Sequence, residues 1–438
     1  MAHVAQAKLR FQIVEKCRLR SCLYVRSDAS RLFGIQVPHT PMKIAILGTR
    51  GIPARYGGFE TLADELSRRL ADRGHDVTVY CRRPFTAADD VYDRRVRRVI
   101  LPTLRDKHFD TLVSGLISTL HVIFSDAEAI LICNVANAPY AWIPRLVGKP
   151  TALNVDGLDR KRRKWNFLGQ AFLHFCEVLA ALTPTRLVTD AQAVRNYYWR
   201  RYHKRSDMIA YGAEPPTVDD NVAQFGVSKG RYVLYVARLE PENNPELVLR
   251  AYREVPTDWP LLIVGGNTYR PEYESKLRAM ADRRVIFTGP VYGDGYWTLQ
   301  KNAGMLIFAG EIGGIHPALV EAMASGNAIA YLDTPANRET CGEAGIAFPA
   351  DYQALAATIA RVIRDPSLAE KLRQAARDRA QARYGWDQVV DGYEKLFREM
   401  TGESGQAATA SLEPPMEMLA GRSENQYESS RSGTRRRA

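Results

Sequence analysis

Residues 43–67 read KIAILGTRGIPARYGGFETLADELS, and this stretch decides the fold. It opens with four apolar residues after Lys43, which is the pattern of a short buried strand at 43–47. A glycine-bearing loop follows, and a helical pattern then runs over residues 60–73. Strand, loop and helix in this order predict the first unit of a parallel, doubly wound α/β sheet.

The same alternation of strand and helix patterns continues along the chain. In the first half we predict strands at 77–81, 129–133, 151–155 and 186–190 and a helix at 167–182. In the second half we predict strands at 231–237, 260–264, 284–288, 304–308 and 327–332, separated by helices at 245–254, 271–282, 295–302 and 317–325. The turn-rich residues 211–216, YGAEPP, divide the two series, and we place a domain hinge there. The chain is thus predicted to hold two Rossmann-like, doubly wound domains that face an interdomain cleft.

These patterns set the domain boundaries that we expect. The N-terminal domain covers residues 42–212, and the C-terminal domain covers residues 213–385. A helix at 386–400 has apolar residues at helical spacing but follows the last helix of the second domain, so its packing partner must lie elsewhere. Residues 401–438 are rich in Ser, Gly, Pro and Glu, and we predict a disordered tail.

Residues 1–41 form a basic leader, with seven Lys or Arg against two Asp or Glu. Two interpretations stay open for it. One is an amphipathic helix that touches a membrane, and the other is a disordered or untranslated extension with the true start at Met42. The whole chain has a net charge of +11, which fits an acidic ligand or an anionic membrane surface. No nucleic-acid-binding motif accompanies this charge, so we expect no nucleic-acid partner.

The apolar and cysteine patterns exclude several other classes of protein. No apolar run reaches the ~18 residues of a membrane-spanning helix, and we predict a buried helix in the most apolar helical stretch, 112–124. The six cysteines are scattered without the spacing of a zinc site or a disulfide framework, and no metal is expected. Since no signal peptide pattern is present either, we predict a cytoplasmic protein, with peripheral contact to the inner face of the plasma membrane left open.

The loop after the first strand, GTRGIPARYGGFE at 48–60, carries the first group of predicted site residues. It lacks the GxGxxG spacing of a dinucleotide-binding turn, so a nicotinamide cofactor is not expected. Its backbone N–H groups could bind a phosphate or a sugar at the start of the helix, and glycines that serve only a tight turn are the alternative. The predicted acceptor or phosphate loop comprises Gly51, Tyr56, Gly57, Gly58 and Glu60.

Four segments share their order and spacing with a known family. They are KIAILGTRGIPARYGGFETLADELS at 43–67, NVDGLDRKRRKW at 154–165, VARLEPENN at 236–244 and GGIHPALVEAMASGNAIAYLDTPANRE at 313–339. In these segments the chain resembles glycosyltransferase family 4, in the branch with a rhamnosyltransferase-like N-terminal domain. The resemblance covers about residues 42–400. It implies the GT-B fold, with an acceptor-side N-terminal domain, a donor-binding C-terminal domain and a C-terminal helix that crosses back to the N-terminal domain.

The predicted donor site begins with Arg238, which follows the strand at 231–237. Ligands of open α/β sheets bind beyond the carboxyl ends of the strands, where a guanidinium can bind a diphosphate with two hydrogen bonds. An arginine that only pairs with a nearby glutamate at the surface is the alternative. The wider family has a lysine five positions later, where this chain has Asn243. Gly265 and Gly266, after the next strand, belong to the same predicted site.

The rest of the predicted donor site comprises Gly313, Gly314, His316, Leu319 and Glu321. The wider family has two glutamates in this segment, and Glu321 matches the second one, which holds the nucleotide ribose. Gly313 stands in the place of the first glutamate. We expect the amides of the glycine pair to meet sugar and phosphate where the helix begins. A solvated side chain at Glu321 is the alternative.

Asp156 follows the strand at 151–155 on the opposite wall of the predicted cleft. It is our candidate to bind or deprotonate an acceptor hydroxyl, and a carboxylate that only caps its loop is the alternative. The basic run at 160–164 could hold an acceptor pyrophosphate or anionic lipid head groups, or could be a solvated face. The predicted catalytic residues are therefore Asp156, Arg238 and Glu321.

The resemblance implies a retaining glycosyltransferase that needs neither a metal nor another cofactor. It implies dTDP-L-rhamnose as the nucleotide-sugar donor and a lipid-linked polysaccharide precursor of the cell envelope as the acceptor. Two alternatives stay open. One is a sugar-nucleotide oxidoreductase or epimerase, and the other is a non-catalytic carbohydrate-binding protein of the same fold.

Overall fold

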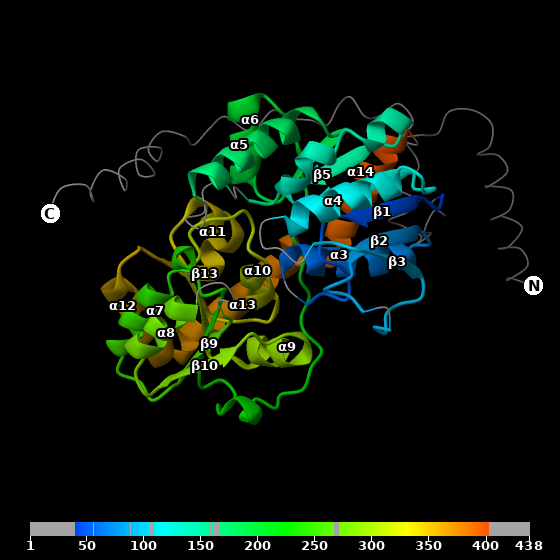
Figure 1. The fold of residues 1–438 in the computed structure, drawn as a ribbon. Helices are drawn as coiled ribbons and strands as arrows, with labels where there is room; N and C mark the ends of the chain where they lie inside the picture. The colour runs from blue at the N-terminus through cyan, green and yellow to red at the C-terminus, as the bar shows by residue number, and fades with distance from the viewer. Residues whose placement is uncertain are drawn as a thin grey trace, which may run out of the picture. The chain divides into compact units, whose positions relative to one another are not determined.

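The computed structural model describes residues 40–55, 57–87, 89–104, 109–157, 160, 166–266 and 271–402. The described residues from Met42 onward belong to one compact unit that contains two parallel sheets (Figure 1). The predicted leader up to residue 39 and the predicted tail from residue 403 lie outside the described residues.

The first sheet is built around β1 (Lys43–Leu47). Its strands are parallel and follow the order β3-β2-β1-β4-β5-β6-β7. The other strands are β2 (Asp76–Arg82), β3 (Val96–Leu101), β4 (Ala129–Cys133), β5 (Thr151–Asn154), β6 (Arg186–Thr189) and β7 (Asp207–Met208). Residues 44–47 are buried, as a central parallel strand covered on both faces requires.

Helices cover both faces of this sheet. They are α3 (Gly58–Asp72), α4 (Asp110–Val122), the short 3-10 helices η1 (Val135–Tyr140) and η2 (Pro144–Val147), α5 (Phe167–Leu182) and α6 (Gln192–Tyr202). Right-handed crossovers place α3 on one face of the sheet and α4 and α5 on the other. The contacts agree, because α4 and α5 both pack against η1, whereas α3 packs against α14 (Trp386–Thr401).

The second sheet follows the order β10-β9-β8-β11-β12-β13, again with parallel strands. Its strands are β8 (Val233–Val236), β9 (Leu261–Val264), β10 (Val285–Gly289), β11 (Met305–Phe308), β12 (Ile329–Leu332) and β13 (Gly345–Phe348). Its helices are α7 (Pro245–Arg253), α8 (Pro271–Met280), α9 (Gly293–Asn302), α10 (Pro317–Ala324), α11 (Pro335–Cys341), α12 (Tyr352–Arg364) and α13 (Pro366–Arg383). The predicted fold class, two Rossmann-like doubly wound units, is confirmed.

The predicted helix at 112–124 is present as α4, but the prediction that it is buried was wrong. Its inner side carries small residues, namely Ser114, Gly115, Ser118 and Thr119, all of them buried. A Cβ on Gly115 would lie 2.1 Å from Asn137 Oδ1, so the helix approaches η1 closely. Leu116, Leu120 and Phe124 point outward and are exposed. Part of this apolar stretch therefore forms an outer surface, while Val122 is buried in the core.

Four of the six cysteines lie within the part of the chain that the structure describes. Cys81, Cys133, Cys176 and Cys341 are free and buried, and burial raises the pKa of each thiol. Among the described residues, no helix is both long enough and apolar enough to cross a membrane.

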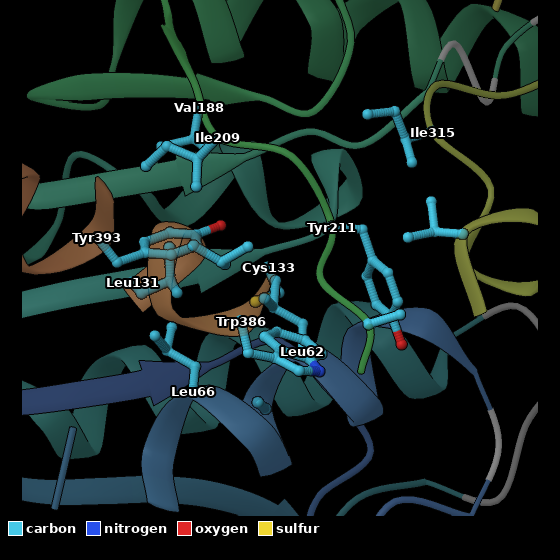
Figure 2. Packing of buried hydrophobic residues seen from close by; sticks show 14 of the residues in the cluster. Leu62, Leu66, Leu131, Cys133, Val188, Ile209, Tyr211, Ile315, Trp386 and Tyr393 are labelled. Carbon is cyan, nitrogen blue, oxygen red and sulfur yellow. The ribbon is translucent and has the colours of Figure 1, made fainter. Parts of the chain in front are cut away.

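Helix α14 belongs to the core of the first half although it comes last in the described chain. It packs against α3 and β4, and Figure 2 shows Trp386 and Tyr393 beside Leu62, Leu66 and Leu131. Asn154 Nδ2 donates to Tyr393 Oη at 2.7 Å, and the Trp386 ring meets Tyr211 edge-on at 5.4 Å. The apolar face predicted for this helix thus finds its partner in the first sheet.

We predict that Trp386→Ala will destabilise the protein by about 3–5 kcal/mol, because a buried indole is lost and a cavity remains. Trp386 is buried, and it also fills the space beside Gly212. Urea unfolding followed by circular dichroism measures the loss. Lys395→Ala, an exposed position on the same helix, is the control and should stay close to the parent protein. A loss for Trp386→Ala below about 1 kcal/mol would contradict a core role for α14.

Candidate functional site

The carboxyl ends of the two sheets meet at a backbone contact. Asp190, directly after β6, accepts the backbone N–H of Ile315 on its Oδ2 at 2.7 Å. A Cβ on Gly314 would lie 2.1 Å from Asp190 Oδ1, and a Cβ on Gly157 would lie 2.7 Å from the nitrogen of Gly314. Only glycine fits at these two positions. The loop that holds the predicted donor residues therefore touches the loop that holds the predicted catalytic carboxylate.

Asp156 and Asp190 form a pair of carboxyl groups at this contact. Asp156 has a φ of 53°, a left-handed conformation that is strained for a residue with a side chain, and its N–H donates to Asn154 Oδ1 at 3.0 Å. Burial raises the pKa of Asp190 well above its ordinary value, and the negative charge of Asp156 raises it further. Two adjacent carboxyl groups cannot both ionise without strong repulsion. The pair therefore retains one proton at pH values above those at which carboxyl groups usually ionise.

Sequence reasoning found Asp156 but missed Asp190. Both residues follow a strand of the first sheet, and β5 and β6 are neighbours. The signal that could have identified Asp190 was its position, because an acidic residue at the carboxyl end of a strand next to Asp156 lies at the same edge. The predicted strand at 186–190 includes residue 190, so the prediction does not show that Asp190 lies just after the strand end.

The loop between β1 and α3 is fixed by buried contacts. Glu60 is buried, and its Oε1 accepts the backbone N–H of Arg50 at 2.8 Å. Burial raises the pKa of this carboxyl group. Gly51 has a φ of +127°, and a Cβ there would lie 2.4 Å from Thr86 Oγ1. Glu60 therefore fixes the loop backbone in this structure, and its contact with an acceptor stays a prediction.

The end of this loop lies against the second half of the chain. Gly57 is the N-cap of α3, and a Cβ on Gly58 would lie 2.7 Å from Cγ of Pro317, the first residue of α10. The N-termini of α3 and α10 are therefore close neighbours. Because helix N-termini stabilise negative charge, this arrangement suits an anion near the glycine loop. Tyr56, the remaining residue predicted for this loop, lies outside the described residues.

Arg238 lies beyond the carboxyl end of β8, as predicted. Its side chain is 45% exposed, and its Nη1 is 3.9 Å from Glu240 Oε1, which is a loose ion pair. Asn243 Nδ2 donates to the carbonyl of Arg238 at 2.7 Å. Asn243, which stands where the wider family has a lysine, therefore fixes the backbone of Arg238 and adds no charge.

Gly265 and Gly266 follow β9, the neighbour of β8. Gly265 has a φ of +140°, and a Cβ there would lie 1.9 Å from the carbonyl oxygen of Ala237. A Cβ on Gly266 would make only ordinary contacts with Pro290. Gly265 is therefore required so that the end of β9 can approach the residue before Arg238.

Glu321 is buried inside the protein in this structure. Its Oε1 accepts from the Tyr211 hydroxyl at 3.0 Å, and its Oε2 accepts from the Tyr296 hydroxyl. Burial raises the pKa of Glu321, while the two tyrosine hydrogen bonds lower it. The carboxylate thus joins α10 to Tyr211, the first residue of the predicted hinge, and to Tyr296 of α9. Its contact with a nucleotide ribose stays a prediction, because both oxygens already have tyrosine partners.

His316 and Leu319 shape the start of α10. His316 is the N-cap of this helix, and its ring stacks on Phe308 with 4.8 Å between ring centroids. A Cβ on Gly313 would lie 2.4 Å from the His316 ring, so the imidazole covers the glycine backbone. Leu319 is buried and contributes packing. No group of three or more His, Cys, Asp or Glu residues that could hold a metal occurs within the described ranges.

The basic run after Asp156 is described only at its first residue. Arg160 Nε donates to the buried Glu177 at 3.2 Å, and its Nη2 donates to the Tyr197 hydroxyl at 3.0 Å. These contacts fix the start of the run on α5 and α6. Residues 161–165 lie outside the described residues.

We predict that Asp190→Asn will be more stable than the parent at neutral pH and that its advantage will grow with pH. The raised pKa means that the folded parent binds a proton more tightly than the unfolded chain does. Its free energy of unfolding therefore falls as pH rises from about 4, the unfolded pKa, through the folded pKa. The amide cannot ionise, and its oxygen still accepts from Ile315.

Urea unfolding of both proteins from pH 4 to pH 8 measures this difference. The free energy of unfolding of Asp190→Asn minus that of the parent should increase by at least about 1 kcal/mol between pH 4 and pH 8. Asp219→Asn, at an exposed position, is the matched control and should follow the parent at every pH. A pH-independent difference between Asp190→Asn and the parent would show that the pair does not hold the additional proton.

Two family models match parts of this chain. The family model described as Glycosyltransferase Family 4 matches residues 56–233, and the model described as Glycosyl transferases group 1 matches residues 219–379. A similar curated protein is the D-inositol 3-phosphate glycosyltransferase of Acidothermus cellulolyticus. It is 24% identical over 86% of this chain and 94% of that protein.

Solved structures share the fold. Sucrose-phosphate synthase from Thermosynechococcus elongatus has a TM-score of 0.70 at 20% identity, over 83% of this chain and 100% of that one. HepE of Anabaena in complex with UDP-glucose has a TM-score of 0.66 at 16% identity, over 81% of this chain and 99% of that one. The chain is therefore a glycosyltransferase of the GT-B fold, similar to family 4 in its first half and to group 1 in its second half.

Proposed function

We propose that this glycosyltransferase transfers L-rhamnose from dTDP-L-rhamnose to a lipid-linked polysaccharide precursor at a membrane surface, with retention of the anomeric configuration. The observation that supports it is the close approach of the Gly313–Gly314 loop to Gly157, the residue after Asp156, where a Cβ would lie 2.7 Å from the nitrogen of Gly314. These are the positions at which the chain resembles the rhamnosyltransferase-like branch of family 4. The sugar-nucleotide donor and the transfer reaction agree with the family models.

The absence of a carboxylate at Gly313 suits a deoxysugar. A glutamate at this position would offer hydrogen bonds to sugar hydroxyl groups, and a buried carboxylate left without such a partner is strongly unfavourable. Here the imidazole of His316 and the ring of Phe308 lie beside the glycine backbone. A 6-deoxysugar presents a methyl group in place of a hydroxyl, and such a group packs favourably on these rings.

Leaving-group stabilisation is the main catalytic contribution that we assign to the second half. The C1–O bond to the diphosphate breaks, and the departing dTDP carries the negative charge. Arg238 binds this diphosphate through its guanidinium, and the amides of the Gly313–Gly314 loop add dipoles of the favourable sign. Positive charge and amide dipoles at the same position leave no required role for a metal.

Acceptor activation is the role that we assign to Asp156. The acceptor oxygen bonds to C1 on the face that the diphosphate leaves, and its proton passes to the carboxylate of Asp156. Asp190 supports this role by holding the retained proton of the pair, which leaves Asp156 ionised and able to accept a proton. The strained backbone of Asp156 places its carboxylate at the strand edge where the two halves meet.

A donor panel tests the proposed function. Full-length protein is mixed with dTDP-L-rhamnose, UDP-glucose or GDP-mannose, with and without a lipid-linked acceptor, and nucleoside diphosphate release is measured. We expect acceptor-dependent release of dTDP at least about tenfold faster than release from the other donors. EDTA should leave this rate unchanged, since Arg238 supplies the positive charge. A faster reaction with UDP-glucose, or activity that only Mg²⁺ or Mn²⁺ restores, would contradict the proposal.

We predict that Arg238→Ala will weaken binding of the nucleoside diphosphate. A charge-assisted contact of this kind contributes about 1.5–3 kcal/mol, so affinity should fall by roughly 10- to 150-fold. Calorimetry measures the affinity for dTDP, on protein whose folding is checked by circular dichroism. Arg231→Ala is the matched control, because Arg231 is an exposed arginine of the same half that pairs with Asp258. Equal dTDP affinity in both variants would show that Arg238 has no part in the donor site.

A further inference from the structure

Large apolar side chains cover the outer surface of α4, η2 and α5. They recur every four residues at Leu116 and Leu120 of α4 and at Phe124, two residues beyond the end of the helix at Val122. On α5 and η2 the most exposed apolar side chains are Phe167 at 82% and Leu146 at 73%, and Phe124 is 86% exposed. We call this the α4–η2–α5 surface. Exposed apolar residues gathered in one place indicate a binding surface, whereas single ones do not.

On α4 the small polar side chains are buried and large apolar side chains are exposed, opposite to the usual arrangement of a helix on a water-exposed surface. A helix of that kind turns its large apolar residues inward and its polar residues to solvent. In α4, Ser114, Ser118 and Thr119 are buried, and leucines point outward. This arrangement leaves apolar area in water unless another phase or molecule covers it.

Contacts within the first half make the stripes one continuous surface. Helices α4 and α5 both pack against η1, and α4 also packs against η2. Arg145 of η2 donates from Nη1 to the carbonyl of Thr183, at the end of α5, at 2.5 Å. The Thr183 hydroxyl in turn donates to the carbonyl of Ala138 in η1 at 3.2 Å. The three elements are therefore neighbours in the first half of the protein.

The charges of this surface favour an anionic partner. The acidic residues of α4 and α5, Asp110 and Glu177, are buried and paired with Arg82 and Arg160. The exposed carboxylate just beyond α4, Asp126, is paired with Lys43 at 2.7 Å. The basic residues on and beside the surface are Arg145, Lys149 and Lys204. Apolar side chains bordered by cations, with their acidic neighbours neutralised, fit the interface of an anionic bilayer.

The surface also lies next to the proposed acceptor site in the chain. Asp156 and Phe167, the first residue of α5, are only 167 − 156 = 11 residues apart. The intervening run is basic from residue 160 to residue 164. A bilayer docked at the start of α5 would thus lie only a short length of chain from Asp156.

From these observations we infer that the α4–η2–α5 surface docks the enzyme on an anionic lipid bilayer. Phe124, Leu146 and Phe167 insert among the acyl chains, and Arg145 binds lipid phosphates. This inference rests on the proposed function for its purpose, because docking brings a lipid-linked acceptor to Asp156. It needs no segment that spans the membrane.

Vesicle binding by the full-length chain tests the inference. Sedimentation is measured with phosphatidylcholine vesicles and with vesicles that contain about one third phosphatidylglycerol, without any donor or acceptor. We expect binding to the anionic vesicles that weakens with salt. The double variant Phe124→Ser/Leu146→Ser should lower the partition coefficient at least about tenfold. Val91→Ser/Leu104→Ser, which removes two exposed apolar side chains elsewhere, is the matched control and should bind like the parent.

Trp142, exposed beside η2, provides a second measurement. Brominated lipids in the vesicles should quench part of the tryptophan fluorescence, and Trp142→Phe should remove that part. Absence of vesicle binding, or equal binding by the two double variants, would overturn the inference. Light scattering that shows a dimer, dissociated by Phe124→Ser/Leu146→Ser, in a chain that does not bind vesicles would assign the surface to a second copy instead.

The two proposals fail in different ways. Vesicle binding without dTDP release in the donor panel would leave the docking surface intact and refute the proposed donor. Release of dTDP with a detergent-solubilised acceptor, by a chain that does not bind vesicles, would support the proposed transfer reaction and refute the docking surface.

Discussion

The contact between Asp190 and the amide of Ile315 is the constraint on which the site depends. It joins the carboxyl edge of one sheet to the loop after β11 in the other. A buried carboxyl group needs such a donor, and the pair with Asp156 adds the need for a retained proton. The glycines at 157 and 314 follow from the same contact, because any side chain there would collide with the opposite loop. The Asp190 side chain and the close approach of the two backbones therefore define this part of the site together.

Helix α14 and Glu321 connect the same halves at a second place. Trp386 packs on Tyr211, and the hydroxyl of Tyr211 donates to Glu321 of α10. One tyrosine thus contacts both the last helix that the structure describes and the helix that carries the predicted donor residue. If Glu321 is to reach a nucleotide, it must exchange its tyrosine partners for ribose hydroxyl groups, and that exchange would loosen the link to Tyr211. In that case donor binding and the relative position of the halves would be coupled through this carboxylate.

The sequence allowed the fold to be predicted because buried parallel strands are continuous apolar runs. The strands at 43–47 and 129–133 and the helix at 167–182 have the bounds that we predicted. Our predictions missed β3, β13 and helices such as α6 and α12, where the pattern is less regular. The error at α4 has a physical cause, since hydropathy does not tell whether leucines face a core or another apolar phase.

The candidate site was less predictable than the fold. Arg238 and Asp156 could be found because each follows a strand, which fixes the edge where its side chain lies. The pairing of Asp156 with Asp190 depends on which strands are neighbours, and the tyrosine partners of Glu321 come from distant segments. Local patterns do not contain this information.

The distribution of charge explains why the net charge of +11 says little about the partners of the protein. Several arginines are used internally: Arg82 pairs with Asp110, Arg186 with Asp207, and Arg284 with Asp282. Such pairs fix loops and strand ends and offer little field to a distant ligand. Arg238 differs because its ion pair with Glu240 is loose, and Arg145 differs because it donates to the backbone carbonyl of Thr183. These two cations lie at the proposed donor diphosphate and the proposed lipid phosphates. Both proposed phosphate contacts therefore use an arginine without a close carboxylate, and neither depends on how many arginines the chain contains.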